Sequence, residues 1–159
     1  MATRKPLVIV SGQIEQLQSG DSLSGPFAEI ENLAQTSGEA GGIVIGMAVY
    51  SSAIDTVKMA KANALSTSQV LGIAQSTFVT TGPGTIQSSG VIALTTAQWD
   101  AVAGTSGGLA YGVVYYLDPA TSGKITATAP ITAGQTVVRV GTAISTTELV
   151  INIQAPVLL

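Results

Sequence analysis

Two of the side chains that most often perform chemistry in proteins are missing from this 159-residue chain, which contains no histidine and no cysteine. Without histidine, imidazole acid–base catalysis, Ser-His-Asp triads and imidazole metal ligands are all excluded. Without cysteine there is no thiol nucleophile, no disulfide framework and no thiolate ligand for zinc. The sequence therefore favours a protein that is not an enzyme and that needs neither a cofactor nor a metal.

Charge is also scarce, because charged residues make up 9% of the chain against about 25% in an average soluble protein. The net charge is −3, and Asp100 and Asp118 are the only charged residues between Ala62 and Gly123. There is no basic patch, so we expect no nucleic-acid partner. A surface with few charges to desolvate suits a protein covered by neighbours, so we expect a homo-oligomer.

Long apolar runs are absent as well. No stretch approaches the ~20 apolar residues of a membrane-spanning helix. The four apolar residues 7–10, which follow Arg4 and Lys5, are too few for the apolar region of a secretion signal. We therefore expect no membrane partner, and synthesis in a bacterial cytoplasm without a leader.

Residues 43–159 predict a β-rich body in which short strands alternate with turns at a spacing of roughly 8–12 residues. One helix interrupts them over Ala97–Ala103, with a threonine cap before it and Gly104 as its stop. We expect Trp99 on this helix to plug one end of the β core. The fold class is therefore all-β, a compact β-sandwich or barrel-like domain with one short helix. The expected strands are Ile43–Tyr50, Thr56–Ala60, Gln69–Ala74, Thr85–Leu94, Tyr111–Leu117, Lys124–Ala127, Gln135–Ile144 and Glu148–Ile153.

A glycine and an alanine stand two residues apart in three of these strands, at 46 and 48, 72 and 74, and 141 and 143. Residues two apart share one face of a strand. Two small side chains on one face permit the close approach of another backbone or sheet. The alternative is chance in a chain with 18 glycines.

Residues 1–42 differ from the rest, and we interpret them as an N-terminal arm that ends at a Gly41-Gly42 linker. Phe27–Gln35 has a short helical spacing, although an extended segment fits equally well. The arm carries apolar residues that a solvated tail would lack, and burying them against a partner would be worth roughly 1.5–3 kcal/mol each. The alternative is that the arm packs on its own body and closes a sheet edge. These candidate contact residues are Leu7, Ile9, Ile14, Leu17, Phe27, Ile30 and Leu33.

Several motifs imitate functional sites. Gly104–Gly108 fits the G-x-S-x-G pattern, but it follows a helix and has no histidine partner. Asp118–Ile125 resembles a phosphate-binding loop only at its Gly-Lys pair, so we interpret it as a turn. Asp21–Gly25 matches no calcium-ligand spacing, and Glu29 and Glu31 have no sugar platform beside them. The sequence therefore predicts no catalytic, cofactor-binding or metal-binding residues.

The segment 112–126, GVVYYLDPATSGKIT, resembles a segment of virion proteins of tailed bacteriophages, as do Val137–Ala143 and Leu149–Ile153. The opening Lys5–Leu17 is similar to the N-termini of such proteins. The Gly-Met-Ala and Gly-Ile-Ala strands are similar to those of small phage decoration proteins. This module is shared between capsid decoration proteins and fibre or tail proteins. The resemblance implies an all-β domain, often a homotrimer, bound at symmetry sites of a capsid.

We therefore expect a capsid decoration, or cement, protein that binds the major capsid protein on the outer surface of the virion. It would stabilise the head against internal DNA pressure by binding only the assembled state, with added avidity as an oligomer. The alternative is the head-binding or receptor-binding domain of a short head or tail fibre that recognises host glycans. The chain has no extended repeats and no long stalk, which favours the decoration protein.

Overall fold

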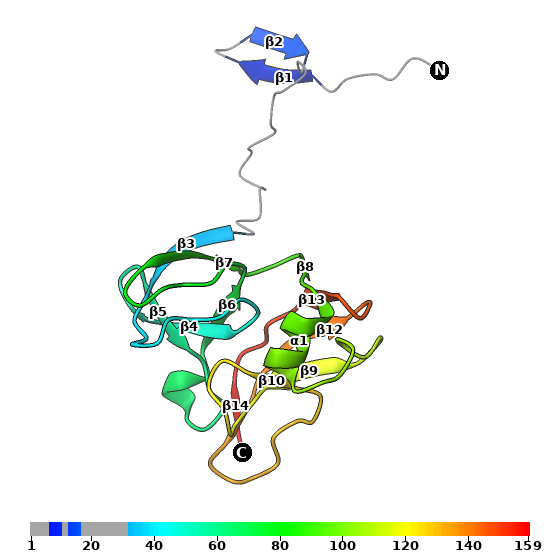
Figure 1. Ribbon diagram of the computed structural model, residues 1–159. Helices are drawn as coiled ribbons and strands as arrows, with labels where there is room; N and C mark the ends of the chain where they lie inside the picture. The colour runs from blue at the N-terminus through cyan, green and yellow to red at the C-terminus, as the bar shows by residue number, and fades with distance from the viewer. Residues whose placement is uncertain (1–6, 11–12, 17–31) are drawn as a thin grey trace.

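The computed structural model describes residues 7–10, 13–16 and 32–159. These residues form many short strands and one α-helix (Figure 1), so the expected all-β fold with a single short helix is confirmed. The strands fall into a closed five-stranded barrel, an open five-stranded sheet and two small two-stranded sheets.

The barrel has the strand order β3-β5-β4-β6-β7. All its neighbouring strands are antiparallel except β3 and β5, which are parallel. Its interior is a small apolar cluster that includes Val49, Val57, Phe78 and Ile86, none more than 1% exposed. Its strands are β3 (Asn32–Ser37), β4 (Ala48–Ala53), β5 (Thr56–Met59), β6 (Val70–Ala74) and β7 (Pro83–Gln87).

The open sheet is antiparallel throughout and has the order β10-β9-β12-β13-β8. On β9, Tyr115 and Leu117 are buried, whereas the residues that alternate with them are half-buried. One face of this sheet therefore belongs to the core. Its strands are β8 (Val91–Ala93), β9 (Val114–Leu117), β10 (Ile125–Thr126), β12 (Arg139–Ala143) and β13 (Glu148–Ile151).

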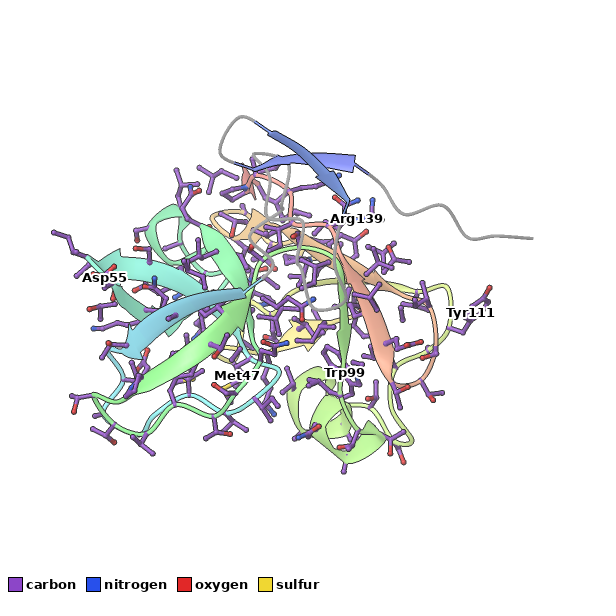
Figure 2. All side chains as sticks on the ribbon, turned by 90° about the horizontal axis from the view of Figure 1, so that it is seen from above. Met47, Asp55, Trp99, Tyr111 and Arg139 are labelled. Atoms are coloured by element: carbon purple, nitrogen blue, oxygen red, sulfur yellow. The ribbon has the colours of Figure 1, made fainter. Side chains whose placement is uncertain are left out.

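The larger apolar core joins the barrel to the open sheet. Ala48, Ala60 and Ile73 contribute to it from the barrel side, and they pack with the buried face of the sheet. Backbone hydrogen bonds cross the same boundary: the Ala48 N–H donates to the Gly123 carbonyl, and the Gly123 N–H donates to the Ala60 carbonyl. Barrel and sheet therefore share one core and lie side by side (Figures 1 and 2).

Helix α1 (Thr96–Ala103) begins one residue before the predicted start at Ala97 and ends at the predicted Ala103. Thr95 and Gln98 form a reciprocal capping box, and Gly104 ends the helix with a φ of 65°. Trp99 is fully buried in the larger core, and its indole N–H donates to the Thr147 carbonyl over 2.9 Å. A 3-10 turn, η1 (Leu65–Thr67), lies between β5 and β6.

The expected arm boundary at residue 42 needs correction, because β3 is a barrel strand. It pairs with β7 over five register positions from Asn32 to Thr36, and with β5 at Thr36 and Ser37. The segment is extended from Asn32 onward, and closure of the barrel covers edges of β5 and β7 that would otherwise be free. Of the expected arm, residues from Asn32 onward therefore belong to the body, and any separate arm ends before residue 32.

Three expected strands are interrupted. In Ile43–Tyr50, a lone bridge pairs Ile43 with Phe78, and β4 begins only at Ala48, after Gly46 with a φ of 89°. Thr85–Leu94 divides into β7 and β8. Gln135–Ile144 divides into β11 (Thr136–Val137), which pairs with β14 (Val157–Leu158), and β12.

An N-terminal hairpin consists of β1 (Leu7–Val10) and β2 (Gln13–Gln16). The two strands are antiparallel, with Ile9 opposite Ile14 and Val10 opposite Gln13. Within the described residues, each of the two pairs only with the other.

Candidate functional site

The G-x-S-x-G motif forms a structural loop organised by Asp100. The carboxylate of Asp100 accepts hydrogen bonds from the Gly108 N–H (2.8 Å), the Gly107 N–H (3.0 Å) and the Thr105 hydroxyl (2.9 Å). The bond from Gly108 is the main reason that the pKa of Asp100 lies below its ordinary value, with the bonds from Gly107 and Thr105 acting in the same direction. This arrangement holds a loop after a helix and has no strand-to-helix elbow of the kind that presents a nucleophile.

The Asp118–Ile125 segment is a turn, as the sequence predicts. The Asp118 carboxylate accepts hydrogen bonds from the backbone N–H groups of Ala120 (2.5 Å) and Thr121 (2.9 Å). The Asp118 N–H donates to the Lys124 carbonyl, which closes the turn just before β10. Two of the backbone donors in the turn are therefore occupied by its own aspartate.

Within the described part of the chain, no group of three or more acidic residues lies close enough together to hold a metal ion. Asp21–Gly25, Glu29 and Glu31 lie outside the described residues. No helix in the described ranges is long and apolar enough to cross a membrane.

The seven expected contact residues do not form one group. Leu7 and Ile9 lie on β1, Ile14 lies on β2, and Leu33 is half-buried on β3 in the barrel, where it pairs with Ile86. The remaining three, Leu17, Phe27 and Ile30, lie outside the described residues. The hairpin is therefore the part of the expected contact region that the structure describes apart from the barrel.

The hairpin is a two-stranded antiparallel sheet in the described residues. Because β1 and β2 pair only with each other in the described residues, the outer edge of each strand presents backbone groups available to a further strand. Leu7 and Ile9 stand two apart on β1, opposite Gln16 and Ile14. An extended segment with a free edge is the element that strand addition uses in protein recognition.

The outer face of the open sheet carries few charges. A row in register crosses four strands through Val91, Val150, Thr142 and Val114. Arg139 (Figure 2) donates from Nη2 to the Thr142 hydroxyl over 2.7 Å, while its buried Nε has no hydrogen-bond partner in residues 32–159. A guanidinium held by a hydroxyl keeps donors that a partner could use.

Exposed apolar side chains also gather at the barrel, at positions that the sequence patterns did not single out. Ile54 is 91% exposed in the β4–β5 turn, beside Asp55 (Figure 2), and Val79 is 67% exposed before β7. Both turns flank the end of β3, since Thr36 bonds to Asp55 and Ser37 bonds to Gly82 through the backbone. Exposure of this kind depends on the tertiary fold, so strand periodicity gives no sign of it.

One aromatic side chain is prominent on the surface of residues 32–159. Tyr111 is 80% exposed in the loop between α1 and β9 and points away from the body (Figure 2). By contrast Trp99, Tyr115 and Phe78 are each at most 1% exposed. The described surface thus lacks the several adjacent aromatic side chains of a sugar-binding platform.

Comparison with known proteins identifies no family for this chain. No model of a known protein family matches the sequence. No curated protein matches it either.

Proposed function

We propose that this protein is a non-enzymatic decoration protein of a tailed-phage capsid, bound to the major capsid protein on the outer surface of the head. The resemblance of residues 112–126 to phage virion proteins supports this proposal. The absence of histidine and cysteine and the 9% content of charged residues fit a structural role. The observation that carries the proposal is the N-terminal hairpin, whose strands pair only with each other in the described residues.

A hairpin of this kind suits a segment that becomes stable only when it binds the capsid. A lone two-stranded hairpin is at best marginally stable in water. Adding a strand of a capsid subunit to its edge would satisfy backbone groups. Burying Leu7, Ile9 and Ile14 there would contribute roughly 1.5–3 kcal/mol for each side chain.

The proposed mechanism of stabilisation is mass action. A protein that binds the assembled shell but not its dissociated subunits stabilises assembly by an amount that grows with its concentration relative to Kd. A homotrimer would multiply weak contacts through avidity. Neither step requires a catalytic group.

Deletion of residues 1–31 tests the role of the N-terminal segment. The truncated protein keeps every strand of the barrel and of the open sheet, so we expect it to fold. We expect it to lose binding to purified shells that lack the protein, as measured by co-sedimentation. A truncated protein that decorates these shells as the full chain does would contradict the proposal.

Point variants separate the hairpin from the rest of the segment. We expect the double variant Ile9→Asp/Ile14→Asp to weaken shell binding at least tenfold. The double variant Ile54→Asp/Val79→Asp is the matched control, because it adds the same two charges at apolar residues of the barrel that are 91% and 67% exposed. Equal loss of binding in both variants would show that added negative charge, rather than the hairpin, is responsible.

A fibre domain that recognises host glycans is the second candidate, and Tyr111 is the residue that favours it. If the protein binds glycans, Tyr111→Ala should abolish binding to a glycan array while leaving shell binding intact. Binding of the full chain to shells, with no signal on the array, supports the decoration protein.

A further inference from the structure

The part of the body around β14 combines three segments without a single charged residue: 62–67, 127–137 and 153–159. Backbone hydrogen bonds join them. The Thr136 N–H donates to the Ala62 carbonyl (3.0 Å), the Leu159 N–H donates to the Gln135 carbonyl (2.9 Å), and the Gly134 N–H donates to the Leu159 carbonyl (3.0 Å). We call this surface the neutral face; Figure 1 shows the C-terminus and the loop before β11 at the same end of the body.

The three segments of the neutral face carry five of the eleven exposed large hydrophobic side chains of residues 32–159. Ile131 is 89% exposed, Val157 is 61% and Leu158 is 59%, while Leu65 and Leu159 are each close to half exposed. Scattered single apolar residues are normal on a protein surface, but a contiguous group rimmed by polar residues marks an interaction site. Thr128 and Thr132, both exposed in the loop before β11, are polar residues close to Ile131 in the sequence.

Strand β14 has the pattern of a strand that should lie between two layers. Val157 and Leu158 point to opposite faces, as successive residues on a strand do, and both are exposed. A strand that is apolar on both faces is typical of an element covered on both sides. In the described residues β14 pairs only with β11, so one edge of β14 is free as well.

We propose that the neutral face is the self-association surface of this protein, and that its occupant is the neutral face of a second copy. The lack of charge argues for this occupant. Each copy carries a net side-chain charge of −3, and two faces that have no charged side chains meet without repulsion between side chains. A patch that is apolar and has no charged side chains can contact a copy of itself, which is what a symmetric interface requires.

Contact between copies would need more of the surface than the apolar side chains. A stable interface buries about 800 Å² on each partner, to which the exposed loop residues of 127–137 would contribute together with the five apolar side chains. The apolar group would thus form the interface core, with the uncharged loop residues around it completing the contact. The inference rests on the proposed function only in taking the protein to be an oligomer.

The mass of the full-length protein in solution, measured by light scattering at micromolar concentration, tests this inference. We expect a multiple of the 16.0-kDa protomer mass. Leu158→Asp and Ile131→Asp should each weaken association at least tenfold, because each replaces an exposed apolar side chain of the face with a charge. Circular dichroism should report an unchanged fold, since both side chains are largely exposed.

The matched control is Ile54→Asp, which adds the same charge at the barrel turn and should keep the wild-type mass. A monomeric wild-type protein would overturn the inference. So would Leu158→Asp and Ile131→Asp variants that keep the oligomeric mass of the wild type, or an Ile54→Asp variant that dissociates. Shell binding is measured separately. If Leu158→Asp dissociates the oligomer, the self-association surface is supported even if the protein binds no shells. If the wild-type protein is a monomer that binds shells, the self-association surface is wrong but the decoration function is not contradicted.

Discussion

At the scale of single residues, Asp100 shows how one carboxylate can fix a loop whose sequence imitates a catalytic motif. Its three hydrogen bonds with Thr105, Gly107 and Gly108 connect the end of α1 to the loop that precedes β9. We expect Asp100→Asn to lower the thermal midpoint at pH 7, because the amide would bring a donor group to a place lined by donors.

The pH dependence of this effect follows from the pKa of Asp100. That pKa lies below its ordinary value, so the carboxylate's contribution to stability is fully present above about pH 4. It is lost as the pH falls through the folded-state pKa. Melting curves should therefore show a constant difference between wild type and variant above about pH 5 that shrinks below about pH 4. Asp55→Asn is the control, and a difference that is the same at pH 3 and pH 7 would contradict the role of the charge.

Gly72 tests the interpretation of the paired small residues. A Cβ added there would lie 2.5 Å from the Gln87 carbonyl oxygen on the neighbouring strand β7, so only glycine fits without movement of the backbone. We expect Gly72→Ala to cost about 1–3 kcal/mol or more of unfolding free energy, as measured by denaturant titration. At Gly41 an added Cβ meets nothing within 4 Å, so Gly41→Ala should stay within about 0.5 kcal/mol of wild type. Equal costs at the two positions would mean that close approach at Gly72 is not what matters.

At the scale of elements, local signals in the sequence were sufficient for α1 and insufficient for β3. The helix has its start and stop in its own residues, Thr95 and Gly104, and both act as predicted. Asn32–Ser37 is mostly polar, and its strand conformation comes from pairing with β5 and β7, far along the chain. For the same reason Leu33 lies in the barrel, away from the hairpin with which the sequence grouped it.

Removal of β3 should therefore cost far more than removal of the segment before it. We expect residues 32–159 to melt cooperatively, and residues 41–159 to melt at a clearly lower temperature or to aggregate, because the edges of β5 and β7 would then be free. Circular dichroism melts with size-exclusion chromatography compare the two. Equal melting temperatures would mean that the barrel does not depend on β3.

At the scale of the whole molecule, the low charge of the chain points to a particular surface only when the fold shows which uncharged segments lie together. The sequence predicted an oligomer from the charge-poor range 62–123. The neutral face shares only residues 62–67 with that range. Its most exposed apolar side chain, Ile131, stands alone in a loop, and those of β14 belong to the short apolar run 157–159, so no helix or strand periodicity marks them. Their grouping is a tertiary property, which explains why sequence patterns could not find it.

The proposed function predicts how the protein changes the stability of a shell. Because the protein would bind only the assembled state, the temperature at which shells release their DNA should rise with protein concentration. It should keep rising slowly above Kd, since a hundredfold excess over Kd corresponds to about 2.7 kcal/mol per binding site. The Leu158→Asp variant should reach the same release temperature only at higher concentration, since it keeps the N-terminal hairpin but loses avidity. The Ile54→Asp control should follow the wild-type curve. The measurement is DNA release from purified heads, followed with an intercalating dye during heating. If wild-type protein binds the heads and the release temperature does not move, then the protein binds intact and disrupted shells equally well, and a stabilising role is wrong.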